Sequence, residues 1–264
     1  MAAGTSYRMP AALPAPASGF VGRAAELGGA RRLLRRARTE RPAGLVTITG
    51  PGGVGKTRLA FRVADEAAGD FRDGVRLVEL SALRDPGLLV HAVEAGLGLA
   101  EPPVSVSVAD REARLDSLLG YLRDRELLLV FDTCEHLVDG CAALAGTLLR
   151  EAPGVTILAT SRQPLGTAGE AVLRLYPLPV PAPGSATAGT ADAVELFAQR
   201  AAAAVPGFTV TPENLADVIT ICQRLDGIPL AIELATVRLR ALPLRQMAEG
   251  IDDRLRLLTG GRRA

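Results

Sequence analysis

A glycine-rich octapeptide between a predicted strand and a predicted helix constrains this chain more than any other feature. Residues 50–57 read GPGGVGKT and match the pattern G-x-x-x-x-G-K-[ST]. An aliphatic run, Leu45–Thr49, precedes them, and an amphipathic stretch begins near Lys56, the single lysine of the chain. In a strand–loop–helix of this kind, backbone amides and the helix N-terminus surround phosphate oxygens, and the lysine spreads its charge over the β- and γ-phosphates. The hydroxyl of Thr57 suits Mg²⁺, so we expect a nucleoside diphosphate or triphosphate as the ligand.

Aliphatic segments of strand length alternate with longer segments of helical spacing through the first two thirds of the sequence, which predicts an α/β fold. Near-continuous aliphatic strands are buried on both faces. The fold should therefore be a three-layer sandwich with a parallel five-stranded sheet, and ligands should bind beyond the carboxyl ends of the strands. The predicted strands are LVTIT at 45–49, VRLVEL at 75–80, LLLVFD at 127–132, VTILAT at 155–160 and, as the weakest, AVLRLY at 171–176.

The composition changes at residues 177–190, where proline, glycine and small residues interrupt any regular pattern. The 264 residues suffice for one large domain or for a medium and a small one. We predict a linker or leader at 1–18, an α/β domain at 19–178, a linker at 179–190 and a small all-α domain at 191–264. The expected helices of the last domain are 191–204, 212–225, a segment that opens at Pro229, and 243–258. The closing GGRRA leads us to expect a fragment of a longer protein.

The strand at 127–132 ends in Asp132, at the sheet edge where a carboxylate meets a magnesium ion bound by Thr57. The alternative for Asp132 is a helix N-cap or a turn residue. Glu135 and His136 follow, and either side chain could polarise a water molecule. Glu135 is the better candidate for a general base, because a histidine at this point is more often a simple helix-start residue.

Arg162 follows the predicted strand at 155–160, so its guanidinium should project from the same edge of the sheet. There it could hold a γ-phosphate through charge-assisted hydrogen bonds. The alternative is a plain surface arginine after a strand.

Composition excludes several classes of protein. With 48% hydrophobic and 22% charged residues the chain is globular, and its longest aliphatic run is too short to cross a bilayer. The start lacks the apolar core of a signal peptide, so we expect a cytoplasmic protein without membrane contact. A net charge of +1 argues against a surface that coats nucleic acid, and the basic run at 31–38 is better explained as an amphipathic helix with solvated arginines. Three cysteines and two histidines are too scattered for a disulfide framework or a zinc site.

Five motifs in order carry a resemblance to a known family. They are FVGR at 20–23 followed by Glu26, GPGGVGKT, LLLVFDTCEH at 127–136, LATSR at 158–162 and GIPLAIELA at 227–235. Together they resemble the nucleotide-binding module of STAND-family P-loop ATPases, nearest to the AfsR-like (SARP) and LuxR-like transcriptional regulators of actinobacteria and more distantly to NB-ARC modules. The similarity extends from Phe20 to the C-terminus.

The resemblance implies a site and a set of partners. GPGGVGKT and LLLVFD would be the Walker A and Walker B motifs, Thr57 and Asp132 would hold Mg²⁺, and Arg162 would act as the sensor of the nucleotide. The catalytic residues would be Lys56, Asp132, Glu135 and Arg162. The nucleotide, ATP or ADP, would contact Val21, Gly22 and Arg23 in the adenine pocket, Gly50, Gly52, Gly53, Val54, Gly55, Lys56, Thr57, Arg58 and Arg162 along the phosphates, and Pro229 from the helical, ARC1-like domain. Full-length relatives carry C-terminal winged-helix and repeat domains and a DNA-binding domain, which are missing here, and nucleotide-dependent oligomerisation is compatible with the family.

The sequence departs from the family pattern at Thr133, where many relatives have a second acidic residue or an asparagine. Slow hydrolysis is therefore expected. The leading hypothesis is a regulatory switch that holds nucleotide between the α/β and helical domains and changes their orientation on exchange or hydrolysis, without direct nucleic-acid binding by this fragment. The alternatives are a small-molecule phosphotransferase, an AAA+-like ATPase ring, and a scaffold whose loop is a relic.

Overall fold

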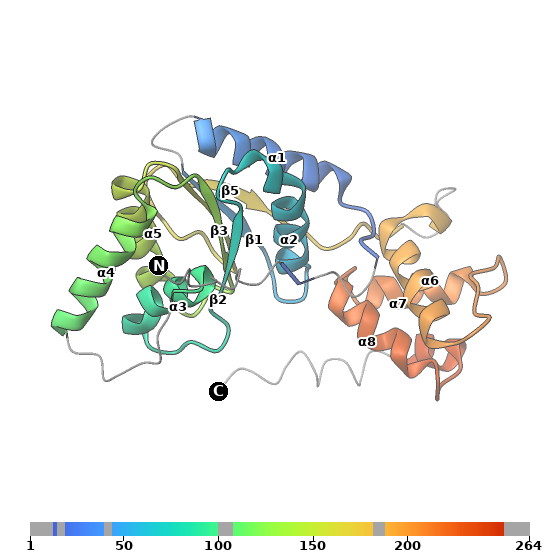
Figure 1. Cartoon of the computed structure of the whole chain (residues 1–264). Helices are drawn as coiled ribbons and strands as arrows, with labels where there is room; N and C mark the ends of the chain where they lie inside the picture. The colour runs from blue at the N-terminus through green and yellow to red at the C-terminus, as the bar shows by residue number, and fades with distance from the viewer. Residues whose placement is uncertain (1–12, 15–18, 40–43, 100–107, 182–187, 251–264) are drawn as a thin grey trace, which may run out of the picture. The chain divides into compact units, whose positions relative to one another are not determined.

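The computed structural model describes residues 13–14, 19–39, 44–99, 108–181 and 188–250 (Figure 1). By its contacts the chain divides into two compact units. The first contains Arg23–Gly50 and Lys56–Leu175, and the second contains Gly19–Gly22, Pro51–Gly55 and the chain from Tyr176 onward. The domain ranges expected from the sequence stay predictions. The predicted leader at 1–18, apart from residues 13–14, and residues 182–187 of the predicted linker lie outside the described residues.

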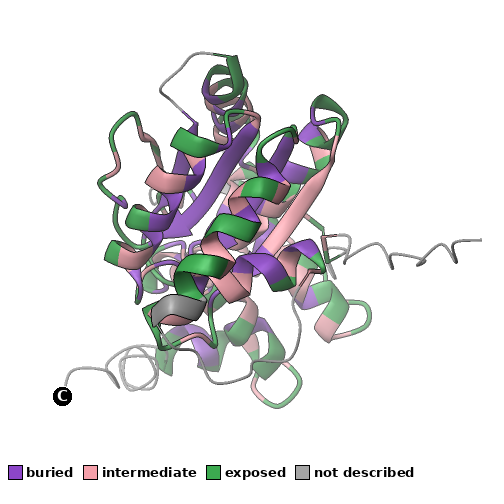
Figure 2. Ribbon diagram, turned by 60° about the vertical axis from the view of Figure 1, so that its left-hand side comes forward, coloured by how far each residue is buried: buried purple, intermediate pink, exposed green. Residues whose placement is uncertain are grey.

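The first unit is built on a five-stranded sheet in the order β2-β3-β4-β1-β5, and every neighbouring pair is parallel. This confirms the predicted α/β architecture, with small shifts at three strand ends. The strands are β1 (Leu45–Thr49), β2 (Val75–Glu79), β3 (Leu127–Asp132), β4 (Val155–Ser161) and β5 (Ala171–Arg174). The central strands β1, β3 and β4 are buried along their whole length, as near-continuous aliphatic sequences require (Figure 2).

Helices cover both faces of the sheet. On one face α1 (Ala24–Thr39) and α2 (Lys56–Ala67) pack against the central strands. On the other, α3 (Leu89–Leu97), α4 (Val108–Leu122) and α5 (Val138–Glu151) share a hydrophobic core with alternate residues of β3, namely Leu127, Leu129 and Phe131. Short 3₁₀ turns follow α2 at Ala68–Asp70 and precede α3 at Pro86–Leu88.

β5 lies at one edge of the sheet and alternates between half-buried and exposed residues, because α1 packs against one of its two faces. This explains why its sequence gave the weakest strand signal. Cys134 and Cys141 lie in the core with α3–α5, and all three cysteines of the chain are buried free thiols.

The second unit is helical. A 3₁₀ turn (Ala188–Thr190) leads into α6 (Asp192–Ala204), followed by α7 (Leu215–Arg224) and α8 (Pro229–Arg238), and residues 244–250 are also helical. Their core contains Phe197, Ile221 and Ile232. The rest of the helix predicted at 243–258 lies outside the described residues.

The chain enters this unit through a tight backbone contact. The amide of Leu178 donates to the carbonyl oxygen of Gly227 at 2.9 Å. A Cβ on Gly227 would collide with the carbonyl of Leu178, and its φ of 63° also favours glycine. The described helices include none that is long and apolar enough to span a membrane.

Candidate nucleotide-binding site

The octapeptide at 50–57 forms a loop between the end of β1 at Thr49 and the start of α2 at Lys56. Three of its glycines have positive φ, with 152° at Gly50, 75° at Gly53 and 100° at Gly55. Side-chain-bearing residues rarely adopt these angles, so the glycines are what allows the chain to turn tightly from strand to helix. The predicted strand–loop–helix context of a phosphate cradle is therefore present.

Lys56 lies in the first turn of α2 and is 9% exposed. Its Nζ donates a 3.0 Å hydrogen bond to the carbonyl oxygen of Gly50, so the ammonium group lies against the start of the loop. Burial is the largest influence on the pKa of Lys56 and lowers it. The negative charges of Glu135 and Asp132 raise this pKa, and the positive charge of Arg162 lowers it, but the net shift is downward. A buried ammonium with a depressed pKa gains from an anionic ligand, because the ligand restores the electrostatic stabilisation that burial removes.

Asp132 ends β3 beside the carboxyl end of β4 and accepts hydrogen bonds from two threonines. The hydroxyl of Thr57 donates to its Oδ1 at 2.7 Å, and the hydroxyl of Thr160 donates to the same oxygen at 2.6 Å. The structure thus brings together Thr57 and Asp132, the two residues predicted to hold Mg²⁺.

These two side chains fit a magnesium ion bound with a nucleotide. Mg²⁺ prefers oxygen ligands and usually takes one or two protein groups together with phosphate oxygens and water. Within the described residues, no group of three or more His, Cys, Asp or Glu side chains gathers to form an all-protein metal site. A hydroxyl and a carboxylate next to a phosphate loop are the donor set expected in this case.

The turn after Asp132 contains a strained residue. Thr133 has a φ of 69°, which is rare for a β-branched side chain. Its amide donates to the hydroxyl of Thr160 at 2.9 Å, and the amide of Cys134 donates to the carbonyl of Thr160 at 2.9 Å. Sequence reasoning missed Thr160. The available signal was a hydroxyl in an otherwise buried aliphatic strand, because such a group usually finds a hydrogen-bond partner.

Glu135 and Arg162 come together at the same edge of the sheet. The Nε of Arg162 lies 3.3 Å from Oε1 of Glu135, with the arginine side chain 65% exposed and the glutamate 21%. The other carboxylate oxygen of Glu135, Oε2, is buried without a hydrogen-bond partner among the described residues. His136 instead turns to a neighbouring loop, where its Nε2 lies 2.7 Å from the carbonyl oxygen of Leu83.

The helical unit includes part of the phosphate loop. Pro229 occupies the first turn of α8, and the amide of Leu230 donates to the carbonyl oxygen of Gly53 at 3.1 Å. A Cβ on Gly53 would lie 2.9 Å from Cβ of Leu230, closer than real contacts allow. Glycine is therefore required at this position by packing as well as by its backbone angle. Val54 is buried, Gly52 is exposed, and Arg58 is half-buried in the first turns of α2.

The N-terminal motif residues have separate environments. Val21 is buried in the core of the helical unit, and Gly22, with a φ of 64°, lies so close to Asp192 that a Cβ would collide with the carboxylate. In the first unit, Arg23 has a φ of 66° and an almost fully buried side chain that pairs with Glu26 at 2.7 Å. The residues are thus held in specific conformations, and an adenine pocket at Val21, Gly22 and Arg23 stays a prediction.

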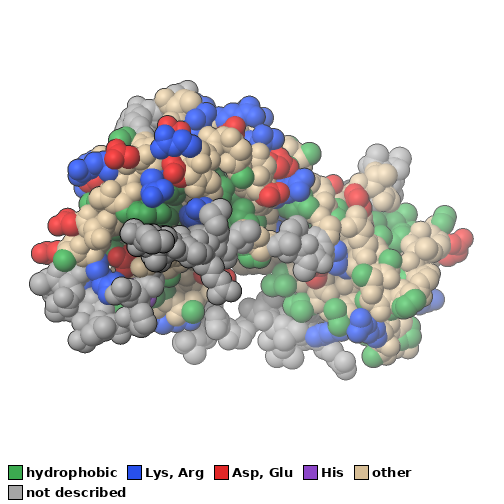
Figure 3. All heavy atoms as spheres, viewed as in Figure 1, with side chains coloured by type: hydrophobic (Ala, Val, Ile, Leu, Met, Phe, Trp, Pro, Cys, Tyr) green, Lys and Arg blue, Asp and Glu red, His purple; other side chains and the backbone are tan. Residues whose placement is uncertain are grey.

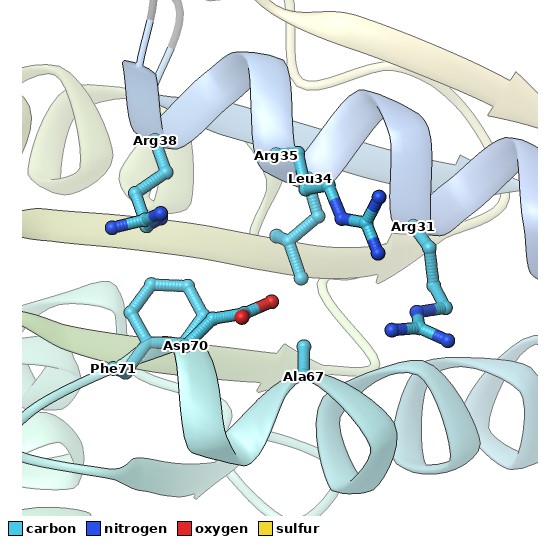
Figure 4. Close-up of a pocket in the computed structure, with 7 residues that line it drawn as sticks. All are labelled: Arg31, Leu34, Arg35, Arg38, Ala67, Asp70 and Phe71. Carbon is cyan, nitrogen blue, oxygen red and sulfur yellow. The ribbon is translucent and has the colours of Figure 1, made fainter.

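A separate shallow pocket lies between α1 and the end of α2, as Figure 4 shows. In Figure 4, Arg38 lies above Phe71, and Arg31 points toward α2, where it pairs with Glu66 at 3.1 Å. Leu34 is buried and points from α1 toward α2. None of the residues that line this pocket belongs to the predicted site. On the face shown in Figure 3, basic and acidic side chains are interspersed over the first unit.

The parallel sheet and the glycine-rich loop between β1 and α2 together have the architecture of a P-loop NTPase. Residues 38–163 match the family model of the AAA domain. An HTH-type transcriptional regulator of Mycobacterium tuberculosis is 44% identical over 217 residues, covering 82% of this chain and 23% of that protein. The regulatory protein AfsR of Streptomyces griseus is 32% identical over 240 residues, covering 88% of this chain and 22% of AfsR. The chain thus contains an AAA-type P-loop NTPase domain and is similar in sequence to these regulators, as the resemblance to STAND ATPases predicted.

Solved structures agree on the fold. The Aeropyrum pernix Orc1 protein in complex with DNA superimposes with a TM-score of 0.62 at 21% identity, covering 92% of this chain and 68% of that chain. Cdc6p from Pyrobaculum aerophilum gives a TM-score of 0.54 at 16% identity, covering 93% and 65%. The chain spans about a quarter of the length of the HTH-type regulators that it matches.

Proposed function

We propose that the chain is the ATP- and ADP-binding switch module of a transcriptional regulator, with slow, regulatory hydrolysis of ATP. The nucleotide binds along Gly50–Arg58, with Lys56 on its phosphates. When Mg²⁺ is bound with it, Thr57 and Asp132 hold the metal, which neutralises phosphate charge. Val21, Gly22 and Arg23 face the adenine, and Pro229 and Arg162 complete the site.

The observation that carries the switch role is the hydrogen bond from Leu230 to Gly53. It ties the backbone of the phosphate loop to the first turn of α8. Phosphates draw the loop amides toward themselves, so a change from ATP to ADP alters the position that the Gly53 peptide prefers. The helical segment therefore has a direct mechanical connection to the state of the nucleotide, and differential contacts of this kind are what shift a conformational equilibrium.

Hydrolysis is assigned to Glu135. Its Oε2 is buried without a partner in the described part of the chain, while Arg162 holds the other oxygen at 3.3 Å. A carboxylate with one free oxygen can accept a proton from an attacking water. Thr133 supplies no second carboxylate directly after Asp132, so only this more distant group is available and turnover is slow.

The partners of the module follow from its relatives. Since the matched regulators are about four times as long, we propose that winged-helix, repeat and DNA-binding domains act in the full-length protein and receive the signal. Nucleic-acid contact belongs to those domains and not to this module. We place the protein in the cytoplasm, and nucleotide-dependent oligomerisation is one way in which the signal is passed on.

Calorimetry with ADP and ATP tests the binding role. Lys56→Ala should weaken ATP binding by about 10- to 100-fold, equivalent to about 1.5–3 kcal/mol for a hydrogen bond to a charged group. Arg62→Ala, nearly two turns further along α2 and half-exposed in an ion pair with Glu66, should bind as the wild type does. Unchanged affinity in Lys56→Ala would contradict nucleotide binding at this loop.

The switch role is tested by Pro229→Ala, with Pro243→Ala as a matched control at an exposed proline before the next helical segment. Limited proteolysis with ADP and with ATP should give different patterns for the wild type and the control. In Pro229→Ala the two patterns should become alike. Identical patterns in the wild type would argue for plain binding without a switch.

A further inference from the structure

Thr160 is a threonine near the end of β4, 1% exposed, whose hydroxyl touches two parts of the candidate site. It donates to Oδ1 of Asp132 at 2.6 Å, and the amide of Thr133 lies 2.9 Å from the same hydroxyl. It lies in the LATSR motif at 158–162, from which only Arg162 was predicted to be a site residue.

The direction of these hydrogen bonds is fixed by chemistry. An amide can only donate, so the hydroxyl oxygen of Thr160 accepts from Thr133, and its single proton is left for Asp132. Thr57 donates to the same Oδ1 at 2.7 Å. Two hydroxyl donors therefore occupy Oδ1.

The other oxygen of Asp132 is differently placed. Oδ2 receives a longer contact of 3.4 Å from the hydroxyl of Thr133, so most of its accepting capacity remains. A carboxylate with one oxygen engaged by two hydroxyls has a fixed orientation, and its second oxygen is the one that can bind a cation or a cation-bound water.

Thr160 also holds the strained turn. Its hydroxyl and its carbonyl oxygen accept the consecutive amides of Thr133 and Cys134. A β-branched residue at a φ of 69° persists only where the surroundings impose it, and these two hydrogen bonds do so. One residue therefore fixes both the carboxylate of Asp132 and the direction of the chain that leads to Glu135.

We propose that Thr160 is a positioning residue for the Mg²⁺–nucleotide complex, which it serves by presenting Oδ2 of Asp132 to the cation. The inference rests on the proposed function, since it assigns a role within the same site. Thr160 acts through Asp132 and does not itself contact the nucleotide.

The test measures the affinity of the 264-residue chain for a fluorescent ATP analogue, once with Mg²⁺ and once with EDTA. The ratio of the affinity in Mg²⁺ to the affinity in EDTA is the gain from Mg²⁺. Thr160→Val should lower the gain from Mg²⁺ by roughly 10- to 100-fold, the usual effect of removing an outer-shell partner of a metal ligand. Its affinity in EDTA should stay within about twofold of the wild type, because Lys56 and the loop amides are untouched. Thr160→Ser keeps the hydroxyl and should keep the full gain.

Thr47→Val is the matched control. Thr47 is a buried threonine on β1, paired in register with Ala159 next to Thr160, and its hydroxyl has no hydrogen-bond partner in the described structure. It should show the wild-type Mg²⁺ gain. An unchanged gain in Thr160→Val, or a lost gain in Thr160→Ser, would overturn the proposal.

Three further outcomes are equally decisive. If Thr160→Val does not fold, Thr160→Ser still decides, because its hydroxyl must by itself sustain the Mg²⁺ gain. If the wild type binds the analogue with no gain from Mg²⁺, the positioning role is overturned and nucleotide binding stands. If the wild type binds no analogue under either condition, the proposed function fails together with the inference.

Discussion

The hydroxyl of Thr57 donates a 2.7 Å hydrogen bond to Oδ1 of Asp132, although the two residues are 75 positions apart in sequence. Thr57 is in the first turn of α2 and Asp132 ends β3, so the contact depends on how helix and sheet pack together. The two predicted metal-binding side chains are therefore in place in the protein alone. A site assembled before its ligand arrives pays less ordering entropy on binding.

Asp132→Asn should remove most of the Mg²⁺ dependence of ATP binding. The neutral amide offers one oxygen in place of two and no negative charge, so the gain from Mg²⁺ should fall at least about tenfold. Titration with ATP in Mg²⁺ and in EDTA measures this. Asp139→Asn makes the same chemical change at an exposed position of α5 and should behave as the wild type does. If both variants lost the gain from Mg²⁺ equally, the cause would be the general loss of negative charge and not a metal site at Asp132.

The strands could be predicted closely because their sequences leave little choice. The segments at 45–49 and 127–132 match β1 and β3 in full, since uninterrupted aliphatic residues define a strand buried on both faces. The ends of β2, β4 and β5 shift by one or two residues, because tertiary packing and edge exposure decide them. The placement of Lys56 and Thr57 at the helix start followed from the glycine pattern alone.

Contacts between segments that are distant in the sequence could not be predicted. Thr160 was part of a recognised motif, but only Arg162 was singled out there, because a hydroxyl becomes informative only once its partner is known. The same holds for the hydrogen bond between Leu230 and Gly53. Such contacts depend on strand register and on helix position to within about an ångström, which periodicity does not define.

Gly53→Ala should destabilise the ligand-free protein more than an equivalent change elsewhere. Its Cβ would lie 2.9 Å from Cβ of Leu230 at a φ of 75°. Gly207→Ala is the control, because Gly207 has a φ of 82° and open space around its Cβ position. Backbone strain should cost about 1–2 kcal/mol in both, and the collision about 1–3 kcal/mol more in Gly53→Ala. Urea unfolding measures the difference. Equal losses would show that α8 does not press on the loop in solution.

Thr47→Val should stabilise the protein. The hydroxyl of Thr47 is fully buried in β1 without a hydrogen-bond partner in the described residues. Replacing an unsatisfied buried polar group by a methyl group of similar shape should raise the free energy of unfolding by about 1 kcal/mol. The midpoint of urea unfolding should rise accordingly. A lower midpoint would mean that an internal water satisfies this hydroxyl.

Lys56 should make stability depend on pH in the alkaline range. Burial places its pKa in the folded protein below the ordinary value of 10.5, so between these two values the unfolded chain binds more protons. Stability should therefore rise with pH across this window, relative to a Lys56→Met variant that lacks the group. ATP affinity should move the opposite way, because deprotonation of Lys56 removes its charge from the phosphates. The free energy of unfolding and the affinity for ATP are measured from pH 7 to 10.5 in the wild type and in Lys56→Met. The slope of each quantity against pH is then compared between the two proteins. If the free energy of unfolding changes with pH in the same way in the wild type and in the variant, Lys56 keeps its ordinary pKa.

Glu135→Gln should separate binding from hydrolysis. The glutamine retains a carbonyl oxygen that can accept from Arg162, so the turn before α5 is preserved, but it cannot take a proton from water. Loss of a general base typically costs about 10²- to 10⁴-fold in rate, while ATP affinity should change by less than about threefold. Single-turnover hydrolysis of labelled ATP measures the first quantity, and calorimetry the second.

His136→Gln distinguishes the two residues that the sequence offered as bases. His136 is exposed and its Nε2 lies 2.7 Å from the carbonyl oxygen of Leu83, so it is turned away from the pair formed by Glu135 and Arg162. Its replacement should leave the single-turnover rate within about twofold of the wild type, since a group without access to the attacking water contributes little to the barrier. A large loss in His136→Gln combined with an active Glu135→Gln would transfer the base to the histidine. That result would also require the loop that carries Leu83 to move when ATP binds, because the histidine must leave its carbonyl partner before it can reach the water.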